Sequence, residues 1–379
     1  MTTAADERPW VLVTGPDQSR ASVAAVRLLA EAGCRVAVTA TGRASLAAAS
    51  RYCRRRVRVP DAEADPAGYA AAVRAELSRG GYLTVLPGSD AASMALGRPE
   101  ARFMNKLQAA ELAGEVGLRV PPSRVFDSYE DLRHAASELP YPAIVKPETK
   151  RFLAQRVERP EDLARVPDGP GRLIVQPFLS DDLHGLLGLM WQGRLVAATH
   201  FRYLRLWPLP AGTVAAAVTT APDPDLEGQV AHVLAGYDGL FHADLAGPYL
   251  LDLNPRIHAT MPLAAAAGAD IVAAYCDVLR GGQPRTVRGR PGIRFQWLEG
   301  DLRSLFRAVR EGRISLRQAL REARPRRGTV HSLESFHDPR PFLERFRFLR
   351  RDFSTRQARR RGERRRARGN SGGPPSGPS

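Results

Sequence analysis

The first hundred residues alternate short apolar runs with helix-forming stretches, and this alternation strongly limits the possible folds. Apolar runs typical of buried strands occupy residues 10–15, 34–40 and 82–88, and amphipathic stretches at 22–33 and 66–81 separate them. Strands that alternate with helices form parallel sheets with helices packed on both faces. The sequence therefore predicts that the chain begins with a doubly wound α/β domain.

The first apolar run ends at Thr14-Gly15, where a dinucleotide-binding domain would carry its glycine-rich turn. No G-x-G-x-x-G pattern follows these residues, so we do not expect a dinucleotide site. The domain is expected to act as a scaffold that lends one wall to a substrate pocket.

The chain is long enough, at 379 residues, for two or three domains. Changes in composition divide it at three points. We expect an α/β domain over residues 1–100, a second α+β domain over 101–285 and a mostly helical region over 286–352. Residues 353–379 are rich in Arg, then in Gly, Pro and Ser, so we expect them to be disordered.

The net charge of +16 is concentrated near the end of the chain. Residues 345–368 contain 12 arginines and only two acidic residues. No aromatic residues lie among the arginines of 356–369, so stacking on bases is not encoded. We expect a solvated tail, with a weak contact to a polyanion as the alternative.

Cysteine usage and hydropathy indicate a cytoplasmic protein without membrane contact. The three cysteines, Cys34, Cys53 and Cys276, form no C-x-x-C pair, which favours a reducing compartment. The first residues do not have the pattern of a signal peptide, and the Ala-rich stretch at 262–275 is too short to cross a bilayer.

Lysine is rare in this chain. Of 56 basic residues only Lys106, Lys146 and Lys150 are lysines. Where arginine is used almost everywhere, a remaining lysine indicates a position that requires a compact ammonium group, such as a tight phosphate site.

The segment Asp252-Leu253-Asn254-Pro255-Arg256 has the pattern of a metal-binding strand. Alternate side chains of a strand share a face, so Asp252 and Asn254 point the same way. A turn near Gly247-Pro248 would bring Asp244 opposite Asp252. These oxygen-bearing side chains suit Mg²⁺, with Mn²⁺ as an alternative ion.

Together these segments resemble the ATP-grasp superfamily. The similarity runs from about residue 10 to residue 285 and follows one order: NKLQAAELAGEVG, YPAIVKP, QPFL and DLNPRIHATMPL. The resemblance implies a pre-ATP-grasp domain, a two-lobed ATP-grasp module and a helical C-terminal cap. It also implies an ATP-dependent ligase that activates a small-molecule carboxylate as an acyl phosphate for attack by an amine, releasing ADP and phosphate.

The resemblance further implies roles for individual residues. The residues expected to bind ATP are Lys106, Lys146, Gln176, Phe178, Leu179 and Asp182. Asp181 is an equal alternative to Asp182 near the ribose. Asp244, Asp252 and Asn254 would hold magnesium, whereas Arg256 and Arg205 would act in catalysis. His242 and His258 flank the metal strands and are expected to be packed or solvated, with a catalytic base as the alternative.

Two departures from the family pattern keep a second function open. Family members usually carry a glycine-rich flap after the second lysine, but no glycine occurs between Lys146 and Leu163. The acidic residue of the last strand is usually Glu, and here it is Asp252. The alternative is therefore a catalytically weak nucleotide-binding or regulatory protein with the same fold. A polyanion-binding protein is a further alternative, and a homodimer is left open.

Overall fold

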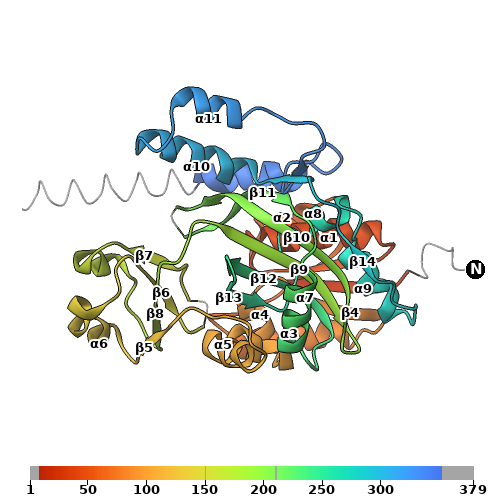
Figure 1. Ribbon diagram of the computed structural model, residues 1–379. Helices are drawn as coiled ribbons and strands as arrows, with labels where there is room; N and C mark the ends of the chain where they lie inside the picture. Colours follow the sequence, from red (N-terminus) through yellow and green to blue (C-terminus); the bar gives the residue numbers. More distant parts are fainter. Residues whose placement is uncertain (1–7, 150, 210, 352–379) are drawn as a thin grey trace, which may run out of the picture.

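The computed structural model describes residues 8–351 except 150 and 210. The segment that we predict to be disordered, 353–379, lies outside this range. Figure 1 shows an N-terminal domain in red and orange, a small lobe in yellow and a large sheet in green and teal. The helices α10 and α11, in blue, lie across one end of the large sheet.

The N-terminal domain is a parallel sheet with strand order β3-β2-β1-β4. This arrangement confirms the predicted doubly wound domain. From β1 the chain adds β2 and β3 on one side of the sheet, and it then returns to place β4 on the other side of β1. The strands are β1 (Trp10–Thr14), β2 (Arg35–Ala40), β3 (Cys53–Arg58) and β4 (Tyr82–Pro87). The helices are α1 (Arg20–Glu31), α2 (Leu46–Ala49), α3 (Pro66–Leu77) and α4 (Asp90–Ala95).

One strand of this sheet, β3, was not predicted. Its sequence is CRRRVR, and only Val57 is fully buried. Arginines dominate it because β3 is the edge strand and alternate side chains face solvent. An apolar pattern is therefore absent from a strand that the sheet nevertheless contains.

The small lobe is an antiparallel sheet with strand order β5-β8-β6-β7. It has its own apolar core, which includes Leu132, Val145 and Val175. Its strands are β5 (Arg124–Phe126), β6 (Ala143–Pro147), β7 (Gln155–Val157) and β8 (Leu173–Pro177). Its helical elements are α6 (Tyr129–His134), a 3₁₀ turn (Ala136–Glu138) and a second 3₁₀ helix (Pro160–Arg165). A further 3₁₀ helix (Pro99–Met104) and α5 (Lys106–Glu115) lead from the N-terminal domain into this lobe.

The large sheet has the order β13-β12-β9-β10-β11-β15-β16, and β14 pairs with β10. Its long central strands are β9 (Leu183–Trp191), β10 (Arg194–Trp207) and β11 (Thr213–Thr219). The outer strands are β12 (Gly239–Ala246), β13 (Tyr249–Asn254), β14 (Val287–Arg288), β15 (Arg294–Gln296) and β16 (Val330–His331). The remaining helices are α7 (Pro224–Val233), α8 (Met261–Ala266), α9 (Ile271–Leu279), α10 (Leu298–Arg310) and α11 (Leu316–Glu322).

Both predicted hairpin turns are confirmed. Gln192 and Gly193 join β9 to β10 with φ values of 49° and 72°. A two-residue turn with both φ values positive matches the right-handed twist of the strands that it joins. Gly247 has a φ of 53° in the turn between β12 and β13, so this glycine adopts the left-handed conformation that other residues avoid.

The region after Gly292 is helical in α10 and α11, but it also contributes strands to the large sheet. β15 pairs with β11, and β16 pairs with β15. The two strands are three and two residues long, too short to give a periodic pattern. The C-terminal region is therefore part of the sheet that carries the central strands, rather than only a helical cap.

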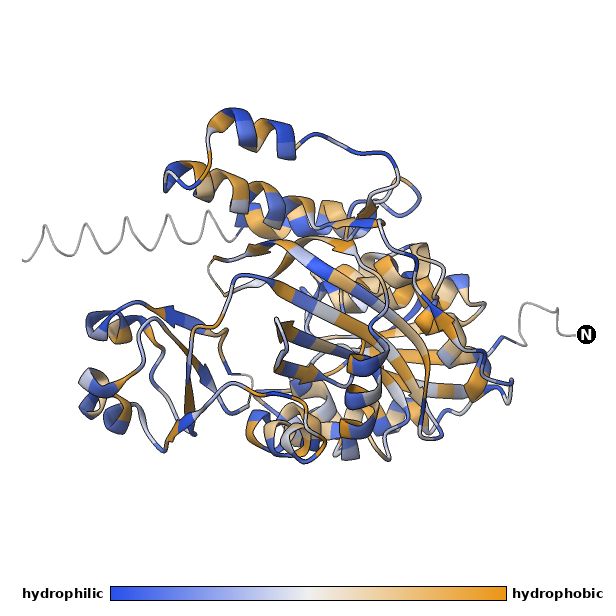
Figure 2. Cartoon of the chain, in the orientation of Figure 1, coloured by the Kyte–Doolittle hydropathy of each residue, from blue (hydrophilic) through white to orange (hydrophobic). Residues whose placement is uncertain are grey.

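A single apolar core joins the N-terminal domain to the large sheet. It includes Val11 and Val13 of β1, Leu187 of β9 and Ile271 of α9, and Figure 2 shows how apolar residues gather in this part of the molecule. Within residues 8–351, apart from 150 and 210, no helix has the length and hydropathy needed to cross a bilayer.

Candidate active site

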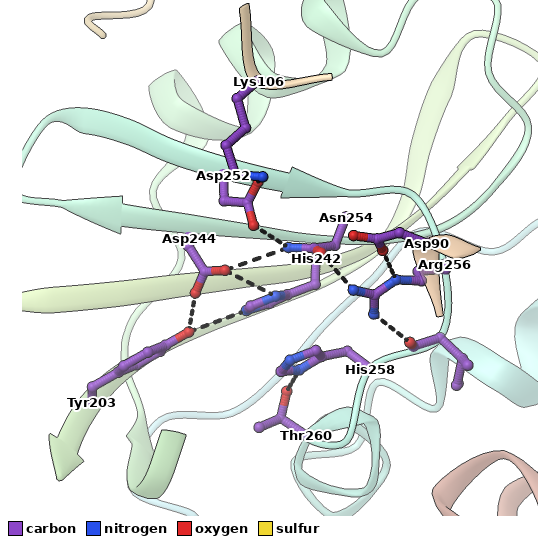
Figure 3. Close-up of polar contacts among 11 residues, drawn as sticks. Asp90, Lys106, Tyr203, His242, Asp244, Asp252, Asn254, Arg256, His258 and Thr260 are labelled. Atoms are coloured by element: carbon purple, nitrogen blue, oxygen red, sulfur yellow. Dashed lines mark hydrogen bonds and ion pairs between the residues drawn. The ribbon is translucent and has the colours of Figure 1, made fainter. Parts of the chain in front are cut away.

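The hairpin of β12 and β13 brings three predicted metal-site residues together. Asp244 lies directly opposite Asp252 in the antiparallel register, and His242 lies opposite Asn254. The Nδ2 atom of Asn254 is 3.3 Å from Asp252 Oδ2 and 3.5 Å from Asp244 Oδ2 (Figure 3). The predicted convergence of the two carboxylates and the amide is therefore confirmed.

Tyr203 on β10 and two histidines surround Asp244. The Tyr203 hydroxyl donates a hydrogen bond to Asp244 Oδ1. Burial and the neighbouring Asp244 carboxylate raise the pKa of Tyr203 well above its usual value, so the phenol remains protonated. His242 Nδ1 lies 3.5 Å from Asp244 Oδ2, and the His242 ring stacks on His258 with 3.9 Å between centroids. These contacts fix the orientation of the Asp244 carboxylate.

The two predicted phosphate-binding lysines meet at the same hairpin. Lys106 begins α5, and its Nζ atom is 3.9 Å from Asp252 Oδ1. Lys146 extends from β6 of the small lobe and donates to the carbonyl oxygen of Leu251 over 2.8 Å. Burial lowers the pKa of Lys146 to about 8, although Asp252 acts in the opposite direction. Two ammonium groups and two carboxylates from separate elements therefore share one small volume.

A cavity of about 590 Å³ extends from these groups between the small lobe, the large sheet and the N-terminal domain. Gln176, Phe178 and Leu179 line it, as predicted for an adenine pocket. Gln176 is buried and donates to Ser123 Oγ over 2.9 Å. The Phe178 amide donates to the Pro142 carbonyl over 2.8 Å. This volume lies within the range of small-molecule sites.

Two predicted site residues lie away from the cavity. Asp182 does not line it, and its carboxylate pairs with His184 at 3.1 Å, whereas the alternative residue Asp181 is part of the lining. Arg205 also lies outside the lining. Its guanidinium group pairs with Asp301 of α10 and, at 2.6 Å, with Glu322 of α11.

In this structure Arg205 ties β10 to the C-terminal helices, and its predicted catalytic role stays a prediction. Side chains two residues apart on a regular strand share a face, yet Tyr203 lines the cavity and Arg205 does not, so β10 is irregular here. The ladder between β10 and β11 also shifts register on both sides of Arg205. The sequence of β10 has no feature that predicts this irregularity.

Arg256 does line the cavity, and it forms a buried ion pair. Its Nε atom donates to Asp90 at the start of α4, and its Nη2 atom donates to Asn254 Oδ1 over 2.7 Å. Arg256 therefore links the N-terminal domain to the predicted metal strand, a contact between residues 166 positions apart.

The donor set of the hairpin fits magnesium in part. Mg²⁺ prefers oxygen ligands and, beside phosphates, commonly uses one or two carboxylates and completes its shell with phosphate oxygens and water. Asp244 and Asp252 supply such carboxylates. The amide of Asn254 turns its nitrogen toward them and its oxygen toward Arg256, so in this arrangement it supports the carboxylates, and its predicted role as a metal ligand stays a prediction. Within the described range, no group of three or more His, Cys, Asp or Glu side chains has the arrangement of a metal site.

The glycine-free segment between β6 and β7 also reaches the cavity. Arg151, Phe152 and Leu153 line it. Glu148 at the beginning of this segment pairs with Arg172 at 2.6 Å and accepts from Asn105 Nδ2 at 2.8 Å. The segment is therefore anchored at its start by side-chain contacts, and it presents one arginine and two apolar side chains where glycines were expected.

The sequence analysis missed the individual residues of the N-terminal wall. Ser19 and Arg20 follow β1, and Ser89 and Asp90 follow β4; all four line the cavity. In doubly wound sheets, ligands bind beyond the carboxyl ends of strands where the connections reverse direction. The expectation that this domain lends a wall to a substrate pocket is confirmed, and the strand order could have identified these two loops.

Comparisons with known proteins agree with this architecture. No family model matches the chain. It is 36% identical over 134 residues to a formate-dependent phosphoribosylglycinamide formyltransferase from Azoarcus sp. (strain BH72), a match that covers 33% of this chain and 31% of that protein. The corresponding protein of Azotobacter vinelandii is 34% identical over 134 residues. The match thus spans about a third of each curated relative.

Solved structures are similar over most of the chain. The L-amino acid ligase from Bacillus licheniformis has a TM-score of 0.53 at 16% identity, covering 74% of this chain and 78% of that one. The biotin carboxylase domain of 2-oxoglutarate carboxylase from Hydrogenobacter thermophilus, in complex with MgADP, has a TM-score of 0.56 at 14% identity, with coverage of 76% and 73%.

An ADP complex of N5-carboxyaminoimidazole ribonucleotide synthetase has a TM-score of 0.55 at 15% identity, covering 75% of this chain and 80% of that one. At these identities the similarity concerns the fold. The chain therefore shares the fold of these three proteins.

Proposed function

We propose that this protein is a magnesium-dependent ligase that joins a small carboxylate to an amine at the expense of ATP. The observation that carries the proposal is the meeting of Lys106, Lys146, Asp244 and Asp252 within one cavity. Ammonium groups bind phosphate oxygens, and carboxylates hold the cation that phosphates require. No simpler role accounts for four charged groups from four elements around a single space.

In the first step, a carboxylate oxygen attacks the γ-phosphorus of ATP. The bond between this phosphorus and the β,γ-bridging oxygen breaks, so ADP leaves and an acyl phosphate forms. Lys146 and Lys106 hold the phosphates in line for this transfer, because each ammonium is already fixed by its contact with β13. A magnesium ion bound by Asp244 and Asp252 would neutralise phosphate charge.

In the second step, the amine attacks the acyl carbon, and phosphate leaves with the electron pair of the broken C–O bond. The amine loses a proton and becomes an amide nitrogen. Phe152, Leu153 and Leu206 give the cavity apolar walls, which limit the access of water to the acyl phosphate. Arg256 holds Asn254 beside the two carboxylates and adds positive charge to the same wall.

The proposal is tested by measuring phosphate release and MgADP binding. Formate, bicarbonate and the standard L-amino acids are the first carboxylates to combine with amines, because the names of the similar proteins include formate, carboxylases and L-amino acids. Calorimetry then measures the affinity for MgADP. Phosphate release that requires both a carboxylate and an amine would support the ligase, whereas a protein that binds no MgADP would contradict it.

The second candidate is a nucleotide-binding protein without turnover. The segment Glu148–Ala154 favours it, because it contains no glycine and is anchored by Glu148, so it is less free to close over phosphates. Binding of MgADP without phosphate release for any combination of carboxylate and amine would favour this candidate.

We also propose a cytoplasmic location and small-molecule partners. All three cysteines are free, as expected in a reducing compartment. A homodimer and a weak polyanion contact of the Arg-rich tail stay predictions, to be tested by light scattering and by binding to heparin.

A further inference from the structure

Arg20 occupies a part of the cavity wall that the proposed reaction does not use. It is the first residue of α1 and lines the cavity beside Ser19, the N-cap of that helix. Lys106, Lys146 and the predicted adenine residues come from α5 and the small lobe. Arg20 instead lies where the N-terminal domain meets the connection between β10 and β11, so it faces the cavity from a different wall.

The Arg20 guanidinium group is held in a fixed position by three separate elements. Its Cζ atom is 3.8 Å from the centroid of the Trp297 ring, just before α10. Its Nη2 atom donates to Thr213 Oγ1 over 2.9 Å, and its Nη1 atom donates to Ser332 Oγ over 3.5 Å. A flat guanidinium on an aromatic face keeps its edge available for hydrogen bonds.

None of these partners carries a negative charge. Among the described residues, no carboxylate forms an ion pair with Arg20. Glu299 and Glu334 lie near enough to raise its pKa, and Glu299 pairs with Arg345 at 2.8 Å. Three other arginines near this wall pair with carboxylates: Arg256 with Asp90, Arg205 with Asp301, and Arg27, further along α1, with Asp338.

Burial lowers the pKa of Arg20 to about 10, a value at which the group still carries its charge at neutral pH. A guanidinium that is removed from water without a direct ion pair is costly, and two hydroxyls occupy only part of its five N–H donors. The wall therefore holds a fixed cation with unused hydrogen-bonding capacity beside a substrate-sized space.

We propose that Arg20 binds an anionic group, a carboxylate or a phosphate, carried by the amine substrate. This inference rests on the proposed ligase function and names a substrate class for it. The reacting carboxylate must lie beside the ATP phosphates, near Asp244 and Asp252, so the group at Arg20 is a second anion, remote from the bond that forms.

The Ser19 hydroxyl adds to this site. It accepts a hydrogen bond from the Ser22 amide over 3.0 Å as the N-cap of α1, so its own hydrogen is available for an anion. The site thus offers a bidentate guanidinium edge and one hydroxyl donor, a combination suited to planar carboxylates and to phosphates.

The test compares amines that differ only in an anionic group. Each standard L-amino acid is paired with its carboxamide, and O-phosphoethanolamine is paired with ethanolamine. Binding to the full-length protein is measured by calorimetry or ligand-observed NMR, with and without MgADP. We expect at least one anionic amine to bind about tenfold or more tightly than its neutral partner. The pair that shows this difference identifies whether Arg20 binds a carboxylate or a phosphate.

Arg20→Gln should remove this preference, and Arg20→Lys should keep part of it. Arg55→Gln is the matched control, because Arg55 also stacks on a tryptophan, Trp10, at 4.5 Å but does not line the cavity. Thermal melting of each variant checks folding. Equal binding of anionic and neutral partners to the wild type would overturn the inference, as would an unchanged preference in Arg20→Gln.

MgADP titrations separate this inference from the proposed function. If the wild type keeps an Arg20-dependent preference for anions but does not bind MgADP, the anion site stands and the ligase proposal fails. If MgADP binds and phosphate is released while no anionic probe is preferred, the ligase proposal stands and the role of Arg20 is wrong.

Discussion

Asp244 and Asp252 face each other directly across the β12–β13 ladder, and the ladder shifts register immediately after Asp244. The pairing fixes the separation of the two carboxylates through backbone hydrogen bonds, so their geometry does not depend on flexible loops. A substitution that keeps side-chain size therefore changes the charge without changing the position.

We expect Asp244→Asn and Asp252→Asn each to reduce phosphate release by about 100-fold or more, because each removes a carboxylate expected to bind the metal during transfer. Nucleotide affinity should fall much less, since adenine contacts are preserved. Initial rates over a magnesium titration measure this effect. Normal rates at limiting magnesium in both variants would show that the metal binds elsewhere.

Asp252→Glu is the companion to these variants. The family pattern places Glu at this position, so the longer side chain should increase turnover if the shorter Asp252 limits metal binding. A decrease in turnover would indicate that Lys106, which lies 3.9 Å from this carboxylate, has adapted the site to Asp. The same magnesium titration distinguishes the two results.

Lys146→Met should weaken the binding of MgADP by about tenfold to 100-fold while the protein remains folded. The ammonium group is expected to contribute a charge-assisted hydrogen bond of about 1.5–3 kcal/mol to the bound phosphates, and its loss leaves a buried apolar side chain of similar length. Calorimetry measures the affinity, and circular dichroism measures the fold. Lys146→Arg should also bind weakly, because the planar guanidinium does not fit the contact with the Leu251 carbonyl.

Nucleotide affinity should depend on pH through Lys146. Burial lowers the pKa of this lysine to about 8 in the free protein, and bound phosphate should raise it. The affinity is then highest below pH 8 and falls by up to about tenfold per pH unit above it. Calorimetry at several pH values, in buffers with different ionisation enthalpies, should detect proton uptake on binding only on the alkaline side. A flat profile between pH 7 and about 9.5 would argue against a charged Lys146 at the phosphates.

Arg205→Ala should lower the stability of the protein, with little direct effect on the nucleotide. Its partner Asp301 is fully buried, and truncation of Arg205 leaves that carboxylate without its main cation. Loss of one member of a buried ion pair typically costs about 3–5 kcal/mol. Urea denaturation measures the loss, and MgADP affinity below the unfolding transition should match that of the wild type.

Deletion of residues 355–379 should leave turnover and thermal stability nearly unchanged. The segment contains few apolar residues, so it has little to offset the entropy of ordering. Binding to heparin should weaken on deletion and vanish near ~0.5 M salt, where the Debye length is about 4 Å. A clearly lower melting temperature would mean that the tail packs on the body of the protein.

The sequence predicted features that depend on local pattern or on motif order. Buried strands such as β1 showed as apolar runs, and the spacing of Asp244 and Asp252 around a Gly-Pro turn predicted their pairing. Prediction from sequence failed for features that depend on contacts between distant parts of the chain. β3 is an edge strand rich in arginine, and the partner of Arg205 lies 96 residues away. Arg20 could not be recognised as a residue of the cavity wall either, because its neighbours Thr213, Trp297 and Ser332 come from distant parts of the chain.

The last strand of the large sheet, β16, has a consequence for how the protein matures. Val330–His331 pairs with β15, and the next residue, Ser332, contacts Arg20. The sheet that carries Asp244 and Asp252 therefore cannot be completed during translation until residues 330–331 have been synthesised. Non-local pairing of this kind folds slowly, so a ribosome-bound chain that ends before β16 should expose an unpaired β15 edge to chaperones or to other nascent chains.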